Sequence, residues 1–273
     1  METDLKRIAL GIEYDGSPWK GWQTQPSRDA IQDILEQALR KFTGQAIHVQ
    51  CAGRTDAGVH ALEQVVHLDT DVHRETVSWV RGLNANLPPS IAVRWAHPLP
   101  QFGDEQFHAR YSATGRTYHY LIYNNPVRSP LLRQRAGWVF RPLDEVRMQD
   151  AARLLTGTHD FSAFRAAQCQ AKTPVRELHE AQVTRQGDML VFTVRANAFL
   201  HHMVRNIVGS LIYVGNGSHP PEWIAELLDG GDRHQAAPTF SPDGLYLARV
   251  DYDAKWQLPQ AARSAFPQLG IHP

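Results

Sequence analysis

The spacing of apolar residues predicts the elements of the first hundred residues. Segment 7–14 alternates like a strand, and Asp29 to Phe42 places its apolar residues on one stripe, which predicts an amphipathic helix. The remaining predicted elements of this half are two short strands, a helix and a strand, at 47–51, 64–69, 75–86 and 91–97. The resulting order is βαββαβ.

The rest of the chain repeats this order. A strand at 116–123 precedes a helix at 144–155, for which Asp144 is the predicted N-cap. Two strands, 180–185 and 189–195, follow on either side of Gln186-Gly187. After them come a long helix at 199–213, a shorter helix from Pro220-Pro221 to Gly230-Gly231, and a last strand at 244–252. Segment 157–165 reads as a helix-terminating turn whose phenylalanines pack inward.

Two such units predict an α+β fold of the α/β sandwich type. Each half would be an RRM-like or ferredoxin-like βαββαβ unit with a mainly antiparallel sheet, and the two sheets would join around a central cleft. We therefore expect one half at 1–104 and the other at 105–273. The repeat rests on element order alone, since the two halves show no sequence identity.

Composition narrows the class of protein. The 273 residues are 42% hydrophobic, which is ample for a packed core. No apolar run approaches the roughly 18 to 20 residues that span a bilayer, and the N-terminus lacks the apolar core of a signal peptide. Cys51 and Cys169 stand far apart without Cys-x-x-Cys spacing, which indicates neither zinc nor a disulfide framework. A cytoplasmic protein is expected.

Charge distribution is more informative than net charge. The chain has 28 Lys and Arg against 28 Asp and Glu, yet residues 106–141 contain six arginines and no acidic residue. Such asymmetry would let one face attract phosphates while the molecule stays neutral. On charge alone, a solvated surface is the more common explanation.

The segment GRTDAGVH, residues 53–60, carries the first candidate chemistry. Asp and Gly between two strands commonly only turn the chain. However, Arg54 stands two residues before Asp56, where a guanidinium would keep the carboxylate ionised and oriented as a nucleophile. The loop is also longer than a hairpin needs and is followed by His60 and Glu63. A hydrolase that uses Asp56 with His60 is an alternative.

Two other segments combine aromatic rings with cations. In RTYHY, alternation places Arg116, Tyr118 and Tyr120 on one strand face, which suits an unstacked base and its phosphates. A core strand under a helix is equally compatible with two tyrosines. The loop at 15–23 contains two tryptophans and a lysine, and could either stack on RNA or cover the core.

The segment FLHHMVRN, residues 199–206, places Arg205 at the rim of an apolar helical stripe. There it could reach water, or be held half-buried by an anion such as Asp56. His201 and His202 would diverge by roughly 100° on a helix, so we expect no shared metal ion.

Taken together, these motifs resemble the TruA family of tRNA pseudouridine synthases across nearly the whole chain. The matching segments, in order, are Tyr14-Asp15-Gly16 with Gly21-Trp22-Gln23, GRTDAGVHA, RTYHYLIYN, FLHHMVRNIVG and Asp243-Gly244-Leu245-Tyr246-Leu247. The resemblance implies isomerisation of uridine to pseudouridine in the anticodon stem-loop, at tRNA positions 38, 39 and 40. It also implies a homodimer, no cofactor or metal, and an active site in the cleft between the halves.

The resemblance also assigns roles to individual residues. Asp56 matches the family's catalytic aspartate, Tyr118 the tyrosine that packs on the target base, and Arg205 the arginine that pairs with the aspartate. Arg54 matches an arginine that helps hold the RNA with the base flipped out, and Leu245 an apolar residue lining the pocket. Segment 101–106 and the stretch after Lys255 depart from the family pattern. The runner-up is a non-catalytic RNA-binding module of duplicated RRM-like units, which gives the Arg-x-Asp loop no role.

Overall fold

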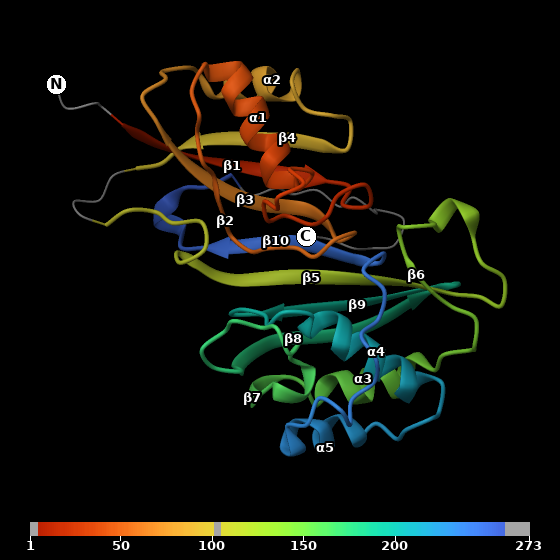
Figure 1. Ribbon diagram of the computed structural model, residues 1–273. Helices are drawn as coiled ribbons and strands as arrows, with labels where there is room; N and C mark the ends of the chain where they lie inside the picture. The colour runs from red at the N-terminus through yellow and green to blue at the C-terminus, as the bar shows by residue number, and fades with distance from the viewer. Residues whose placement is uncertain (1–4, 101–104, 260–273) are drawn as a thin grey trace. The chain divides into compact units, whose positions relative to one another are not determined.

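The computed structural model describes residues 5–100 and 105–259. Its chain forms two compact units, Met1–Thr114 together with Leu247–Pro273, and Gly115–Tyr246 (Figure 1). We call them the first and the second unit. Mixed helices and mainly antiparallel strands confirm the predicted α+β class, whereas the halves at 1–104 and 105–273 and the cleft between them stay predictions.

The first unit is a sheet with two helices. Its elements confirm the predicted βαββαβ order and are β1 (Lys6–Tyr14), α1 (Ile31–Thr43), β2 (Gln50–Cys51), β3 (His60–Thr70), α2 (Thr76–Asn84) and β4 (Ile91–Pro98). Strand β10 (Leu245–Tyr252) is added from the end of the chain, and all but its first two residues belong to this unit. The strand order is β4-β1-β3-β10, and β2 pairs with β3. β1 lies antiparallel to both neighbours, with Leu10 opposite Val66 of β3 and Ala96 of β4.

Helix α1 forms where the apolar stripe predicted it. Its buried face includes Ile31, Leu35 and Leu39, and its first turn is fastened by Asp33, which accepts hydrogen bonds from the Ala30 N–H (3.2 Å) and the Thr24 hydroxyl (2.6 Å). Figure 1 shows α1 and α2 together on one side of these strands.

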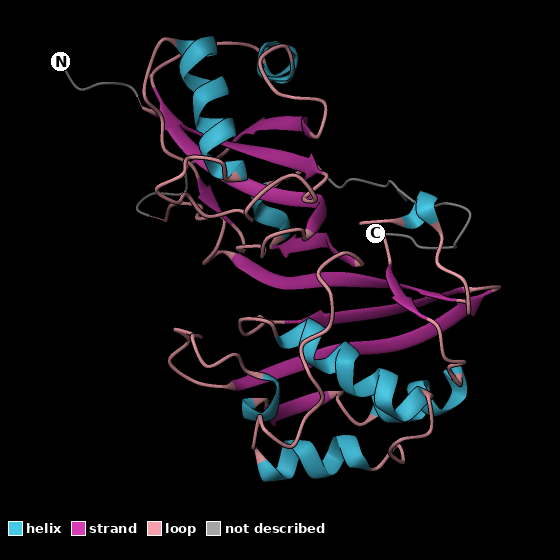
Figure 2. Cartoon of the chain, turned by 45° about the vertical axis from the view of Figure 1, so that its right-hand side comes forward, coloured by secondary structure: helices cyan, strands magenta, loops and turns pink. Residues whose placement is uncertain are grey.

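The second unit contains a sheet of mainly antiparallel strands and three helices. Its elements are β5 (Ala113–Asn124), β6 (Gly137–Val139), α3 (Glu145–Arg153), β7 (Gly157–Asp160), β8 (Val175–Gln186), β9 (Met189–Ala196), α4 (Met203–Gly215) and α5 (Trp223–Gly230). The order β5-β9-β8-β7 is antiparallel throughout, and β6 pairs in parallel with the end of β5. The helices cover one side of the sheet (Figure 2).

Several boundaries in the second unit differ from the sequence prediction. Segment 157–165 is not a simple turn, because Gly157–Asp160 forms β7 on the edge of β8, although Phe161 and Phe164 are fully buried as predicted. Strand β6 was not predicted. The long helix begins at Met203 and not at Phe199. Asp144 is confirmed as the N-cap of α3, since its carboxylate accepts from the N–H groups of Val146 and Arg147.

The two departures from the family pattern fall partly outside the described residues, which exclude 101–104 and 260–273. The C-terminal stretch that departs from the family pattern overlaps a short 3-10 turn, Ala254–Trp256. In this turn Trp256 is 2% exposed and packs edge-on against Phe107. Among residues 5–100 and 105–259, no helix combines the length and the apolar character needed to cross a membrane.

Candidate functional site

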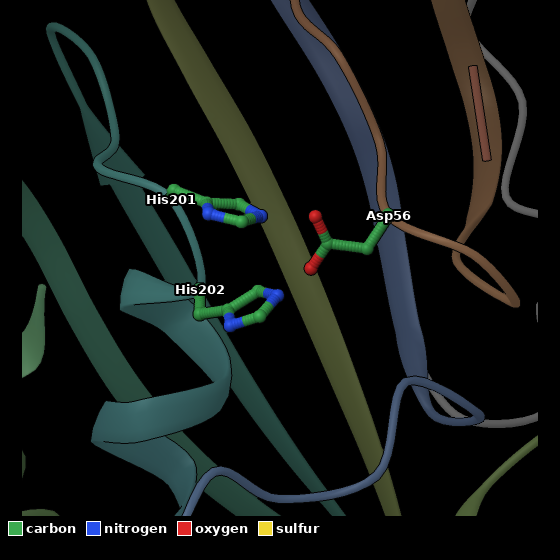
Figure 3. A group of neighbouring side chains, drawn as sticks. All are labelled: Asp56, His201 and His202. Atoms are coloured by element: carbon green, nitrogen blue, oxygen red, sulfur yellow. The ribbon is translucent and has the colours of Figure 1, made fainter. Parts of the chain in front are cut away.

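Asp56 lies half-buried on the loop that leads from β2 into β3 (Figure 3). The start of the loop is attached to β3, because the Ala52 N–H donates to the Val65 carbonyl (2.8 Å) and the Gln64 amide donates to the Gly53 carbonyl (2.6 Å). The end of the loop is a turn in which the Val59 N–H donates to the Asp56 carbonyl at 3.1 Å. Gly58 completes this turn at φ +80°, a conformation that favours glycine.

A second loop, residues 15–23, packs directly on the backbone around Asp56. The Trp22 N–H donates to the Thr55 carbonyl at 3.0 Å. A Cβ on Gly21, whose φ is +84°, would stand 2.7 Å from that carbonyl oxygen, and a Cβ on Gly16 would stand 1.9 Å from the Val59 carbonyl oxygen. Both glycines are therefore required for the close approach of the two loops.

The residues flanking Asp56 are anchored in the core of the first unit. The Tyr14 and Thr55 hydroxyls form a buried hydrogen bond of 2.8 Å. Trp22 is 1% exposed and stacks at a tilt on Tyr14, so this tryptophan covers the core, as one of the two sequence interpretations proposed. The hydrogen bond and the packing of these neighbouring residues thus hold the backbone at Asp56 in place.

His60 takes part in the same packing. Its buried ring accepts a hydrogen bond from the Gly16 N–H at Nδ1 (3.1 Å), and Asp15 Oδ1 lies 3.2 Å from the same nitrogen. This engagement with the 15–23 loop gives His60 a structural role and speaks against the hydrolase alternative. Arg54, in contrast, is exposed on the loop.

In the second unit, Tyr118 lies on β5 opposite Val194 of β9. It is 9% exposed, and its ring meets Phe199 edge-on at 5.0 Å between centroids. Tyr120, two residues along the same strand, is fully buried and donates its hydroxyl to the Ser241 carbonyl (2.6 Å). Burial raises the pKa of Tyr120 far above its usual value. Of the two tyrosines, Tyr120 is therefore a core residue.

Arg205 is half-buried on the first turns of α4. Its Nε donates to the Phe240 carbonyl (2.8 Å), while the Phe240 N–H donates to the Arg205 carbonyl (3.2 Å). This reciprocal pair fastens the segment before β10 to the helix. Leu245, 6% exposed, follows Gly244, where a Cβ would meet the Leu121 carbonyl oxygen at 2.2 Å.

His201 and His202 lie just before α4, and their expected divergence is wrong. His202 is the N-cap of α4 with φ +61°, so the pair is not helical. The two rings lie with centroids 3.9 Å apart at an angle of 37° (Figure 3). The prediction of divergence applied helical geometry to residues that form a turn.

The predicted site residues thus form two groups. Arg54 and Asp56 share one loop of the first unit, and Tyr118, Arg205 and Leu245 belong to the second unit. That the two groups meet stays a prediction. Sequence reasoning missed the Tyr14–Thr55 bond, for which the only signal was the Tyr14-Asp15-Gly16 motif.

Comparison with known proteins decides the family. The model of the tRNA pseudouridine synthase family matches residues 11–112 and 151–253. The chain belongs to this family. It is 65% identical over 255 residues to tRNA pseudouridine synthase A of Herminiimonas arsenicoxydans, covering 93% of each chain. It is 63% identical to the protein of that name from Janthinobacterium sp. (strain Marseille), covering 95% of this chain and 97% of the relative.

The activity follows from this membership: the synthase isomerises uridine in tRNA to pseudouridine. Among solved structures, that of a Cbf5-Nop10-Gar1 complex overlaps 88% of this chain and 48% of that chain, with a TM-score of 0.36 and 13% identity. This likeness is too weak to bear on the site.

Proposed function

We propose that Asp56 is the catalytic carboxylate and that the modified uridines lie in the anticodon stem-loop of tRNA, at tRNA positions 38, 39 and 40. The observation that carries the proposal is the double support of the Asp56 loop. It is hydrogen-bonded to β3 on one side and to the 15–23 loop on the other. A reacting group held this way needs little reorganisation when the substrate arrives.

The reaction breaks the N1–C1′ bond, turns the uracil while it stays bound, and joins C5 to C1′. The proton on C5 is lost and N1 gains one, so the product is an isomer. The Asp56 carboxylate could attack C1′, promote elimination at the ribose, or add to C6. Each route requires the ionised form of Asp56.

The second group of residues would complete the site. Tyr118 would pack on the target base, and its edge-on contact with Phe199 supports this role by fixing the ring. Arg205 would pair with Asp56, and Leu245 would line the pocket. Arg54, exposed on the loop, would help hold the RNA while the base is flipped, a step that costs a few kcal/mol.

We further propose that the enzyme acts in the cytoplasm as a homodimer, and without a cofactor or metal. Base-resolved mapping of pseudouridine in tRNA from cells that lack the gene would test the positions. Pseudouridine persisting at all three positions would contradict the assignment.

The role of Asp56 is tested by Asp56→Asn, which keeps the size of the side chain and removes its charge. The variant should bind tRNA normally and release no tritium from uridine labelled at C5. Asp229→Asn, an exposed position on α5, is the matched control and should react at the wild-type rate. Tritium release retained by Asp56→Asn would refute the role, and free uracil in the wild-type reaction would indicate hydrolysis.

A further inference from the structure

Residues 125–141 of the second unit form an exposed loop between β5 and α3, which we call the arginine–aromatic loop. It contains a short 3-10 turn, Pro130–Leu132, and strand β6 (Figure 1). Four of its large apolar side chains are exposed: Val127 (70%), Leu131 (91%), Trp138 (45%) and Phe140 (57%). So many in one loop indicate an interaction surface.

Side-chain hydrogen bonds to backbone carbonyls hold this loop in place at both ends. The Asn124 amide donates to the carbonyls of Val139 (2.9 Å) and Arg141 (2.7 Å), and the Trp138 indole donates to the Asn125 carbonyl (2.8 Å). Tyr246 donates its hydroxyl to the Arg135 carbonyl at 2.7 Å. The exposed side chains are therefore presented from an ordered support.

The charge of the loop has one sign. It carries Arg128, Arg133, Arg135 and Arg141, and no acidic residue occurs from position 106 to 141. Within the described residues, Arg128, Arg133 and Arg141 form no ion pair. The Arg141 guanidinium instead lies 5.7 Å from the centroid of the Phe140 ring. Arg128, Arg133 and Arg141 are thus available to an anionic partner.

Exposed rings beside Arg128, Arg133 and Arg141 suit a nucleic acid better than a second copy of the chain. Phosphates attract the guanidinium groups, and bases stack on aromatic side chains whatever their sequence. Two copies of the loop facing each other would bring like charges together without a carboxylate to offset them.

We propose that the arginine–aromatic loop is an RNA-binding surface that contacts the tRNA at nucleotides other than the reacting uridine. Arg128, Arg133 and Arg141 bind phosphates, and Phe140 and Trp138 stack on an unpaired base. The inference rests on tRNA being the substrate, and it does not depend on which residue performs the chemistry.

The test combines Arg128→Gln, Arg133→Gln and Phe140→Ser in one variant. Its control combines Arg40→Gln, Arg153→Gln and Val175→Ser, three exposed positions outside the loop with the same change in charge and one apolar side chain removed. Binding of tRNA is measured over a range of KCl concentrations, and pseudouridine formation is measured in single turnover with saturating enzyme.

We expect the loop variant to bind tRNA on the order of tenfold or more weakly than the control. The slope of log affinity against log salt should fall by about one to two, because up to two phosphate contacts are lost. The rate at saturation should stay at the wild-type value. A benzophenone amino acid replacing Leu131 should crosslink to tRNA.

Equal affinity and salt slope in the two variants would overturn the proposal. So would a loop variant that changes only the self-association of the protein in sedimentation, because that result assigns the loop to a protein interface. Failure of the Asp56 assignment is distinguishable, since it changes turnover by Asp56→Asn and leaves these binding measurements as they are.

Discussion

Replacing Glu63 by glutamine is expected to change how the stability of the first unit depends on pH. Glu63 lies on β3 and is 8% exposed. Burial raises the pKa of its carboxyl from 4.5 to about 7, with Arg249 opposing the rise and Asp251 adding to it. Glutamine has nearly the same size and carries no charge at any pH, so the substitution removes this titration.

The magnitude follows from the pKa shift. Between pH 4.5 and about 7, folded Glu63 retains a proton that the unfolded chain has released, so the free energy of unfolding falls as pH rises through this window. The shift corresponds to about 3 kcal/mol, at about 1.4 kcal/mol per pH unit. The stability of Glu63→Gln relative to wild type should therefore rise by about 3 kcal/mol between pH 4 and pH 8.

His67, on the same strand, titrates in the opposite direction. Burial lowers its pKa from 6.5 to about 4, with Arg7 and His108 adding to the effect and Asp69 opposing it. Its contribution to stability is present above pH 6.5 and is lost as pH falls towards 4. Because wild type and variant share His67, the difference between their stabilities isolates Glu63.

The measurement is urea unfolding at half-unit steps from pH 4 to pH 8.5, followed by tryptophan fluorescence. Glu180→Gln, the same change at an exposed position on β8, is the control and should give a constant difference from wild type. A constant difference for Glu63→Gln, or one that falls with pH, would refute the reasoning.

Three further substitutions test the packing described above. Gly21→Ala should slow pseudouridine formation in single turnover by about 100-fold, because its Cβ would displace the Thr55 carbonyl; an unchanged rate would count against the role of the 15–23 loop. Tyr14→Phe should lower the free energy of unfolding by about 1–3 kcal/mol, since it leaves the Thr55 hydroxyl buried without this partner, and the double variant with Thr55→Val should recover part of that loss in chemical denaturation. Asp144→Ala should cost about 1 kcal/mol in the same assay and leave activity intact, whereas Asp144→Asn should cost less.

Elements with strong local signals could be predicted from the sequence. Helix α1 has an uninterrupted apolar stripe, and α3 has a good N-cap in Asp144, so both were identified within a few residues. Strands β6 and β7 could not be, because three or four residues of mixed polarity carry no periodicity. Their pairing is determined by distant residues of β5 and β8. The early start predicted for α4 failed at His202, whose positive φ has no signal in an apolar stripe.

Among the candidate site residues, too, those with a local sequence signal could be predicted, and those defined by long-range contacts could not. Asp56 and Arg54 were identified because their motif is contiguous. The hydrogen bond between Tyr14 and Thr55 joins residues 41 positions apart, and no local pattern reports it. For the same reason, Tyr118 and Tyr120 look alike on their strand, and only the three-dimensional structure distinguishes the slightly exposed Tyr118 from the fully buried Tyr120.

The placement of β10 has a consequence for synthesis on the ribosome. In the first unit β3 has β1 on one edge and β10 on the other, yet 132 residues, Gly115–Tyr246, separate the two parts of that unit. At about 5–20 residues per second, that segment takes roughly 7 to 26 seconds to translate. During that interval the nascent chain exposes the part of this β3 edge that β2 does not pair, and this part can template wrong pairing. Chaperone protection of the nascent chain would matter most in this interval, and the second unit, being continuous, can fold before the first is complete.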